Sequence, residues 1–457
     1  MTLNLSQIAP QVGAMAREAS ARHDVFARRG AAALSLMRAW DGRLDALRGL
    51  VQETEPWLVA EPLEPLLTAR PAPRIPPDVT VVATDGSGID LDRHGLAQCY
   101  LINVGAAVIT YGANPDAALS SRAALYYRDD DLYLDDDGAR VPVQGALADL
   151  KRTLAEQARL LEIVRELRPS PSSPASYPSP PGPWLTGPSA AADGPARLSL
   201  KGRGGEGYGD ADALREGSPL PRQGEGLGVR AVGFPLVAVL DGTLLLWQLA
   251  GRAGEERFVA EAIAEYAAGL LEFRRLGVPV CSYVSRPNGR ELTNLLRLAA
   301  CPSGGDDVAP TRCANCVDGE CARDFLEPLP DRALMDHLRH GERSGRFASR
   351  SPVLRYYGAD CGIEFVYVNV GDEVARLEIP AWVGADPAML DLVHAAVYDG
   401  CQRGWGYPPA LAEAHEQAVI RGGERDAFLR LVMEALNESD QPAELSAKRL
   451  SKNRRAV

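Results

Sequence analysis

Apolar residues recur along this chain with two different spacings, which separate its strands from its helices. Apolar and β-branched residues dominate 79–84, 98–110 and 122–127, and short turn segments separate these runs. Such runs predict three neighbouring strands of an antiparallel meander. Residues 144–167 instead carry apolar side chains three or four positions apart, which predicts a helix with one buried face. Pro169 ends that helix.

A second group of elements follows further along the chain. A buried-strand run at 235–240 precedes an amphipathic helix at 255–276, a strand at 278–284 and a helix at 289–300. Without the segment 169–233, the order is strand, strand, strand, helix, strand, helix, strand. This order predicts an α/β protein with a ribonuclease-H-like fold, a mixed sheet with flanking helices. Its first three strands are expected to be antiparallel, and its later strands to arrive through helical crossovers.

Regions at both ends complete the expected organisation. Residues 1–70 are expected to form an N-terminal helical region, because 14–54 is rich in helix-forming residues. A main domain is expected over 79–437, and a basic tail over 438–457. The C-terminal third adds a predicted strand pair and three predicted helices, at 363–370, 373–379, 387–401, 409–420 and 424–436.

The segment 169–233 differs in composition from everything around it. Pro, Gly and Ser are frequent there, and the phrases KGRGGEGYG and PRQGEGLGVR resemble diverged copies of each other. Such a segment buries too little apolar surface to offset its ordering entropy, so we expect a disordered insertion into the domain. A linker between two domains is the alternative.

Charge limits the partners of this 457-residue chain. Its 61 acidic and 49 basic residues give a net charge of −12, so its overall field does not attract nucleic acid. Any nucleic-acid site must be local, and the candidates are 339–350 and 448–455, each with a solvated face or a disordered tail as the alternative. No apolar run reaches the length of a membrane span, and the N-terminus lacks the order of a secretory signal. The cytoplasm is therefore the expected compartment.

Two Asp-Gly pairs lie at the ends of predicted neighbouring strands. Asp85 and Asp241 end the runs at 79–84 and 235–240, and their carboxylates are expected to face each other beyond the sheet edge. Paired carboxylates suit Mg²⁺ or Mn²⁺, and two such ions promote phosphodiester hydrolysis. The alternative is that both pairs are ordinary turn residues.

Four motifs then point to a family. VVATDGSG (81–88), PLVAVLDGTLLL (235–246), VARLEIPAWV (374–383) and GYPPALAEAHEQAVI (406–420) resemble the NurA nuclease family, in which a ribonuclease-H-like domain degrades DNA with manganese. The resemblance implies that Asp85 and Asp241 bind metal and that Tyr407 and His415 line the active site.

The resemblance also implies a glutamate on a helix, and two candidates lie within 144–167. Glu156, in the context R-x-x-x-E, lies about as far upstream of Asp241 as the family's glutamate. Helical periodicity places Glu156 opposite the apolar stripe, whereas Glu162 flanks that stripe. We take Glu156 as the third carboxylate, with Glu162 as its rival.

His415 and Tyr407 also carry chemistry of their own. A neutral imidazole at His415 can bind metal or orient the attacking water, and the Tyr407 hydroxyl can hydrogen-bond a phosphate oxygen. A structural histidine and a packing tyrosine are the alternatives. Arg376 and Glu378 are interpreted as an ion pair on one strand.

Four of the eight cysteines are close together in the sequence. Cys301, Cys313, Cys316 and Cys321 suit a tetrahedral Zn²⁺ site, and their irregular spacing also allows an iron–sulfur cluster. Four unconnected thiols are the alternative. The isolated Cys99, Cys281, Cys361 and Cys401 are expected to be ordinary buried thiols.

Two functional hypotheses follow. The resemblance implies a Mn²⁺-dependent deoxyribonuclease with 5′ to 3′ exonuclease and single-strand endonuclease activity. It also implies a homodimer that works with a HerA-type hexameric ATPase in DNA end processing and repair. The alternative is a non-catalytic ribonuclease-H-like scaffold that binds nucleic acid or an ATPase.

Overall fold

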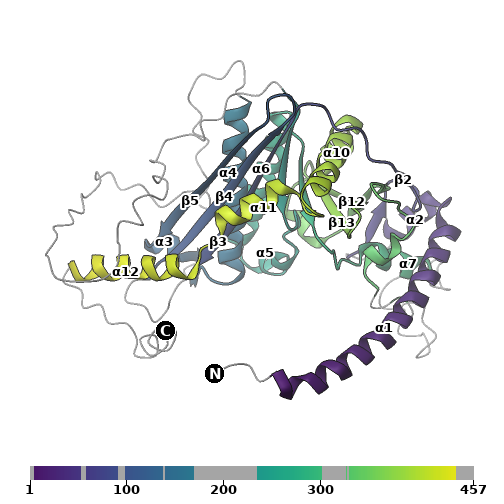
Figure 1. The fold of residues 1–457 in the computed structure, drawn as a ribbon, viewed down its shortest axis with the longest axis horizontal. Coiled ribbons are helices and arrows are strands. Elements are labelled where there is room, and N and C mark those ends of the chain that lie inside the picture. The colour runs from purple at the N-terminus through teal and green to yellow at the C-terminus, as the bar shows by residue number, and fades with distance from the viewer. Residues whose placement is uncertain are drawn as a thin grey trace.

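A computed structural model describes most of the chain (Figure 1). The described residues are 5–52, 58–90, 98–136, 139–168, 234–300, 326 and 329–438. The expected insertion at 169–233, the cysteine cluster at 301–321 and the tail from 439 lie outside them.

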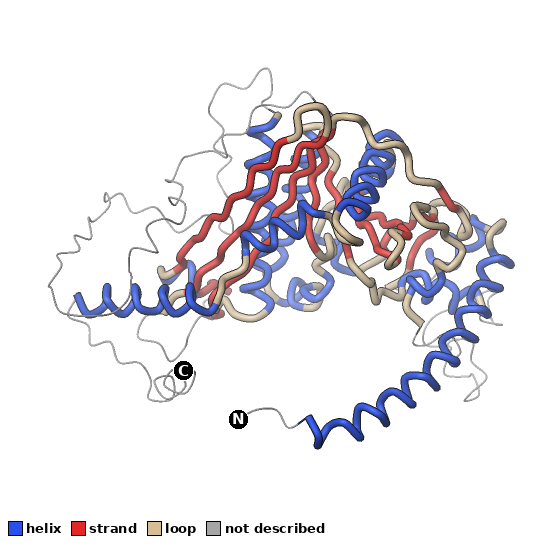
Figure 2. Tube along the Cα trace, in the orientation of Figure 1, coloured by secondary structure: helices blue, strands red, loops and turns tan. Residues whose placement is uncertain are grey.

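A large mixed sheet forms the centre of the molecule (Figure 2). The long strands β3 (Val79–Ile89), β4 (Tyr100–Tyr111) and β5 (Asp116–Tyr126) form the antiparallel meander that the sequence predicts. β8 (Leu236–Asp241) pairs in parallel with β3, and β9 (Val280–Val284) in parallel with β8. The order across this half is therefore β5-β4-β3-β8-β9.

The other half of the sheet continues from β9. β13 (Val374–Pro380) pairs antiparallel with β9, and β12 (Ile363–Asn369) with β13. Gly371, with a φ of 110°, makes the turn between β12 and β13 that the sequence predicts. The remaining strands are short, and they are β10 (Arg343–Ser344), β11 (Phe347–Ser349), β1 (Ala60–Pro62) and β2 (Ala69–Arg70).

The N-terminal region is not purely helical, contrary to expectation. Its helices α1 (Leu5–Trp40) and α2 (Leu44–Gln52) are followed by β1 and β2, which pair with β11 and β10. Strands of two or three residues show no alternation that a sequence pattern can reveal. The end of α1 and α2 share a second core with α7 (Glu291–Ala299), built on Met37, Leu47 and Leu295, while the start of α1 projects from the body (Figure 1).

Helices cover both faces of the central strands. α4 (Ala146–Leu167) and α6 (Arg257–Arg275) pack together on one face. α11 (Pro409–Ala418) contacts β3 and β4 on the other face, and α10 (Pro387–Arg403) precedes it (Figure 1). Successive residues of a strand point to opposite faces of the sheet. Gly86 therefore faces α4, whereas its neighbour Asp85 shares the other face with its pairing partner Gly105, which faces α11.

The helix boundaries agree closely with the sequence pattern at the C-terminus. Asp386 caps α10 by accepting hydrogen bonds from the N–H groups of Ala388 and Met389, and Pro409 begins α11. α12 (Gly422–Glu438) follows and has no buried residue. The sequence pattern did not predict a set of short elements: α3 (Asp129–Leu132), β6 (Tyr133–Asp136), β7 (Ala139–Pro142), α5 (Arg252–Glu255) and α9 (Ala381–Gly384). Among the described residues, no helix is long and apolar enough to cross a membrane.

Candidate active site

Asp85 and Asp241 lie side by side where the pairing of β3 with β8 stops. The last paired residues are Thr84 and Leu240. Asp241 ends β8, as the sequence predicts, and Gly242 takes a left-handed φ of 83° just beyond it. Asp85 does not end its strand, because the long β4 continues to pair with β3 as far as Ile89. The expected position of Asp85 at a strand end is therefore wrong.

His415 approaches Asp85 from α11. Its Nδ1 lies 2.7 Å from Asp85 Oδ2, while Asp85 Oδ1 accepts the Gly86 N–H at 2.8 Å. A carboxylate only accepts, so Nδ1 is the donor, and in the neutral tautomer this leaves Nε2 as an acceptor. His415 is 59% exposed, so that second nitrogen is accessible to water.

The position of α11 depends on residues that the sequence analysis did not single out. A Cβ at Gly105 would lie 2.1 Å from Ala414 O, so glycine is what lets the helix rest directly on β4. Asn103 Nδ2 donates to Ala418 O at 2.9 Å, and the Ser87 hydroxyl donates to the same carbonyl. These contacts fix the last turn of α11 and with it His415. A glycine inside a strand is the signal that predicts such a close approach.

Tyr407 holds Asp241. Its hydroxyl donates a hydrogen bond to the Asp241 carboxylate, and its ring packs edge-on against Tyr283 with centroids 5.3 Å apart. Burial, followed by the charge of Asp241, raises the pKa of Tyr407, so the phenol stays protonated as a donor. Burial raises the pKa of Asp241 as well, while the hydrogen bond from Tyr407 acts in the opposite direction.

Glu156 reaches the two aspartates from α4 on the opposite face. It passes Gly86, where a Cβ would lie 2.4 Å from Glu156 Oε1. The Thr84 hydroxyl donates to the Glu156 backbone carbonyl at 3.0 Å. Burial raises the pKa of Glu156 to about 8, and the charge of Asp85 is the next cause. Arg152, with Nε 3.6 Å from Oε1, acts in the opposite direction.

Glu162 lies in a different environment. Arg122 on β5 donates to it at 2.7 and 3.1 Å, and Arg159 pairs with it at 3.0 Å. The structure therefore brings Glu156, and not Glu162, to the aspartates. Periodicity placed Glu156 opposite the apolar stripe, yet its side chain is only 14% exposed, because the missing side chain of Gly86 leaves it room beside the sheet.

The three carboxylates suit a divalent cation by their chemistry. Each is a hard oxygen donor, and the charges of Asp85 and Asp241 both raise the pKa of Glu156. Among the described residues, however, no group of three or more His, Cys, Asp or Glu side chains is already arranged around a common metal position. Asp85 and Asp241 instead direct oxygens at Gly86, Gly242, His415 and Tyr407.

The four clustered cysteines lie outside the described residues, so their zinc or iron–sulfur site stays a prediction. Cys281, Cys361 and Cys401 are buried free thiols, as expected, whereas Cys99 is only partly buried.

The loop after Asp241 is held by a buried ion network. Glu378 Oε2 accepts hydrogen bonds from the Thr243 hydroxyl and the Leu244 N–H, both at 2.7 Å. Arg376 Nε donates to Glu378 Oε1 at 2.8 Å, which confirms the predicted ion pair on one strand. Arg376 also donates to Glu291 at 2.7 Å. Sequence analysis assigned no role to Glu291, which lies in no motif, or to Thr243, which lies in the motif at 235–246 but was not singled out there.

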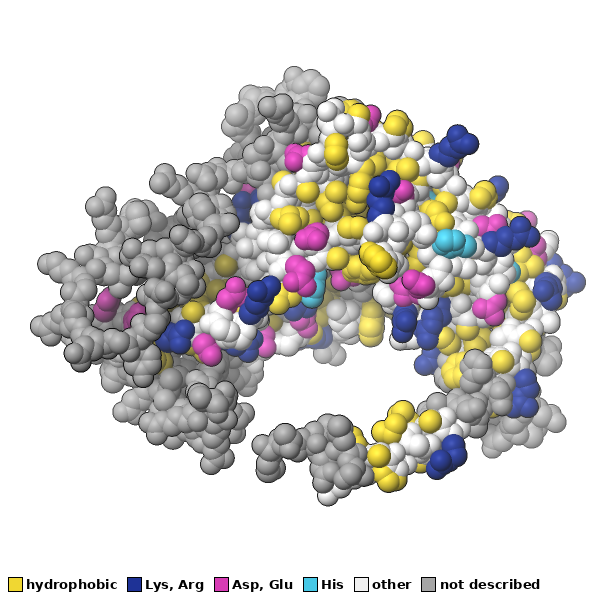
Figure 3. All heavy atoms as spheres, viewed as in Figure 1, with side chains coloured by type: hydrophobic (Ala, Val, Ile, Leu, Met, Phe, Trp, Pro, Cys, Tyr) yellow, Lys and Arg dark blue, Asp and Glu magenta, His cyan; other side chains and the backbone are white. Residues whose placement is uncertain are grey.

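The basic segment 339–350 is not an open cationic patch. Arg343 is buried beside Glu64, Arg346 pairs with Glu364 at 3.2 Å, and Arg350 pairs with Glu61 at 3.3 Å. Internal pairs therefore neutralise three of the four arginines that the sequence offered to nucleic acid. Basic and acidic side chains are interspersed on the face shown in Figure 3.

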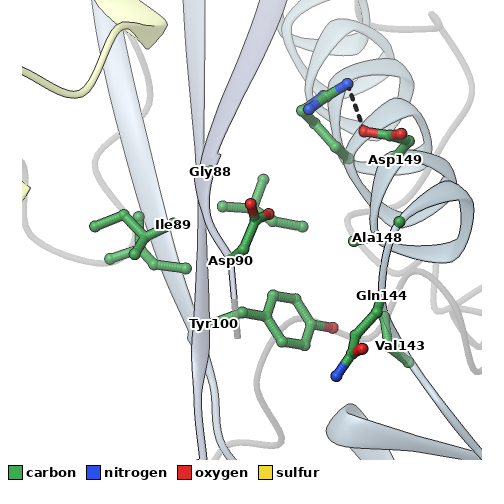
Figure 4. Close-up of a pocket in the computed structure, with 12 residues that line it drawn as sticks. Gly88, Ile89, Asp90, Tyr100, Val143, Gln144, Ala148 and Asp149 are labelled. Atoms are coloured by element: carbon green, nitrogen blue, oxygen red, sulfur yellow. Dashed lines mark ion pairs between the residues drawn. The ribbon is translucent and has the colours of Figure 1, made fainter. Parts of the chain in front are cut away.

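A cavity of about 200 Å³ lies beside the carboxylates (Figure 4). It is bounded by the ends of β3 and β4 and by the start of α4, with Asp90, Tyr100 and Gln144 among its walls. Arg152 lines it and pairs with Asp149 at 2.9 Å, the ion pair drawn in Figure 4. This cavity and the carboxylates therefore share Arg152.

The fold and the site define an α/β protein with an acidic cluster at the carboxyl edge of a mixed sheet. The NurA domain model matches residues 79–420. The chain therefore belongs to the NurA family, a family of nucleases. A solved structure, described as the crystal structure of the NurA nuclease from Sulfolobus solfataricus, is similar at 13% identity with a TM-score of 0.39, over 81% of this chain and 88% of that chain. None of the curated proteins matches this chain.

Proposed function

We propose that this chain is a divalent-cation-dependent nuclease that hydrolyses DNA phosphodiesters, with Mn²⁺ or Mg²⁺ as its ion. One observation carries the proposal: carboxylates from β3, β8 and α4 meet at one rim of the sheet, where they outnumber Arg152, the arginine that lies 3.6 Å from Glu156. The strand order β5-β4-β3-β8-β9, with its first three strands antiparallel and the next two parallel, supports a ribonuclease-H-like fold.

In this proposal Asp85, Asp241 and Glu156 hold the cation. When bound, the ion supplies an activated water and stabilises the oxygen that leaves. Asp85 fixes the His415 tautomer through Nδ1, so that Nε2 accepts a proton from water. Tyr407 keeps Asp241 oriented by donating to it, in place of the phosphate contact that the sequence suggested.

The finer features of the function come from the family resemblance. They are 5′ to 3′ exonuclease and single-strand endonuclease activity, a homodimer, and a HerA-type ATPase partner in DNA end processing and repair. The net charge of −12 supports a substrate that is delivered to the site, because the overall field does not attract DNA. We also carry forward a cytoplasmic location and a Zn²⁺ or iron–sulfur site at Cys301, Cys313, Cys316 and Cys321.

Cleavage of end-labelled single-stranded DNA in Mn²⁺ tests this proposal. The wild-type chain should shorten the labelled strand progressively. The variant Asp85→Asn, which keeps the size of the side chain, should leave the strand intact. Equal cleavage by both proteins would refute the assigned chemistry. Absence of cleavage, with and without an ATPase partner, would favour the non-catalytic scaffold.

A further inference from the structure

Two residues next to the turn between β12 and β13 have a backbone conformation that their side chains disfavour. Arg286 has a φ of 43° and Trp405 a φ of 58°, and no other non-glycine residue in the described part of the chain has a positive φ. Bulky residues rarely adopt this region, and strain of this kind concentrates at functional sites. The strained backbone at both residues therefore suggests a functional role.

Trp405 occupies a position that helices usually give to glycine. It follows Gly404, the C-cap of α10, and the Gly406 N–H donates to Cys401 O at 2.8 Å, the long-range bond of a Schellman motif. In this motif the residue directly after the C-cap takes the left-handed conformation, and here that residue is Trp405. Its side chain is 97% exposed, so it contributes almost nothing to the core of this chain.

Arg286 lies two residues beyond β9, at the same edge of the sheet as Asp241. Its N–H donates to Glu373 Oε2 at 3.1 Å, which anchors the backbone. Its guanidinium is 82% exposed, with Nε 3.7 Å from the same carboxylate oxygen. That oxygen already accepts the Ser285 hydroxyl at 2.8 Å, so Arg286 keeps most of its donors for solvent or a ligand.

One turn connects both residues to the carboxylates. A Cβ at Gly406 would lie 2.9 Å from Asp372 Oδ2, so the Trp405 loop rests on the turn between β12 and β13. Glu373 of that turn also accepts the Tyr283 hydroxyl at 2.7 Å. Tyr283 packs against Tyr407, which donates to Asp241. The strained pair is thus built into the same contacts that orient the site.

We propose that Trp405 and Arg286 form a subsite for one unpaired nucleotide of a single strand, next to the phosphodiester held at the carboxylates. The indole stacks on the base and the guanidinium contacts the neighbouring phosphate, the two interactions by which proteins bind single strands without reading sequence. This inference rests on the proposed nuclease function and deepens it by assigning two side chains that hold the strand beside the site.

The surroundings of Trp405 favour a base over a protein partner. The other exposed large apolar side chains in the described residues lie outside both the loop 404–408 and the turn 370–373. Protein hot spots instead lie inside a ring of contacts that excludes water.

Fluorescence anisotropy with a labelled oligothymidine tests the subsite, using the full chain with Asp85→Asn in every protein so that the strand is not cut. Trp405→Gly should raise Kd about 5- to 150-fold. Because glycine tolerates the left-handed backbone, the midpoint temperature of thermal unfolding should stay the same in this variant or rise by about 1–3 °C. Trp405→Phe should bind within about threefold of its parent, since the ring still stacks.

Two further variants separate stacking from charge and position. Arg286→Gln should weaken binding and reduce the slope of log Kd against log salt concentration by about 1. Trp247→Ala is the matched control, because Trp247 is also exposed, at 62%, but lies on the segment after β8. It should leave Kd within about twofold. A blunt duplex, whose bases are paired, should respond less than about twofold to Trp405→Gly.

Unchanged oligothymidine binding by Trp405→Gly would overturn the subsite. So would an equal loss in Trp405→Gly and Trp247→Ala, or a change only in self-association or ATPase binding, which would assign Trp405 to a protein contact. The proposed function fails separately, if the chain with Asp85 intact cuts no DNA while Trp405→Gly still weakens binding.

Discussion

Two groups of acidic side chains in this protein have opposite electrostatic surroundings. Around Arg376, the carboxylates of Glu291 and Glu378 share a buried guanidinium that lies 2.7 and 2.8 Å away. Around Glu156, the charges of Asp85, Asp241 and Asp149 raise its pKa, and among the described residues the charge of Arg152 lowers it. Burial raises the pKa of Glu291 and of Glu156 alike, but the charge of Arg376 counteracts it at Glu291.

We interpret this difference as the one between a structural cluster and the proposed cation site. A buried carboxylate that is paired and hydrogen-bonded is complete and has no need of a ligand. A cluster whose members repel one another carries a free-energy cost that an external cation would remove. The Arg376 network also supports the other cluster, because Glu378 holds the loop that follows Asp241.

The largest effect is expected from Asp241→Asn. Loss of one charged oxygen donor should lower the rate of DNA cleavage by about 10³-fold or more, because residues of one catalytic unit fail together. The midpoint temperature of thermal unfolding should not fall in the same variant, because the substitution removes a charge that the neighbouring carboxylates repel. A folded variant that cuts DNA at the wild-type rate would break the distinction between the two clusters.

Arg376→Met should be the most destabilising change on the other side. It leaves two buried carboxylates without their partner, so the free energy of unfolding should fall by about 3–5 kcal/mol in urea titration. Arg403→Met is the control, because its pair with Asp399 is at the surface, and it should cost about 0–1 kcal/mol. Similar losses in both variants would show that Arg376 is no special counterion.

The pH dependence of stability should depend on Glu156. Its folded-state pKa is raised to about 8 from 4.5, so between these pH values the folded protein binds more protons than the unfolded chain. The free energy of unfolding should therefore decrease as pH rises through that window, by about 2–4 kcal/mol in EDTA. Glu156→Gln should flatten the profile and be the more stable protein at pH 8.5. If the wild type and Glu156→Gln had parallel profiles of unfolding free energy against pH, Glu156 would not lie close to the two aspartates.

The smallest effect is expected from Glu162→Gln. Glu162 is already paired with Arg122 and Arg159, so single-turnover cleavage should stay within about threefold of wild type. Glu156→Gln, measured beside it, should lose at least about 10²-fold. A larger loss of cleavage in Glu162→Gln than in Glu156→Gln would make Glu162, and not Glu156, the third carboxylate.

Sequence patterns predicted the elements that bury a long apolar face or run. β3, β4, β8 and α4 have such faces, and the motif around Asp241 marks the end of β8, whereas β3 continues past Asp85 to Ile89. Edge strands such as β1 were invisible, because three residues carry no period. The N-terminal region therefore looked more helical than it is.

Contacts across the sheet were harder to predict than the elements. The position of Glu156 depends on the missing side chain of Gly86, and that of His415 on Gly105, so each depends on a glycine far away in the chain. The guanidinium that balances Glu291 comes from β13, 85 residues later. Periodicity reports the faces of one element, whereas these contacts depend on how two elements approach.

Isothermal titration calorimetry of the metal-free protein with Mn²⁺ tests the central claim most directly. If the acidic rim is a cation site, the wild-type chain should bind Mn²⁺ and release protons near neutral pH, as shown by heats that differ between buffers of different ionisation enthalpy. The double variant Asp85→Asn, Asp241→Asn should lose this binding, while Glu162→Gln keeps it. Equal Mn²⁺ binding by the double variant and the wild type would contradict the account.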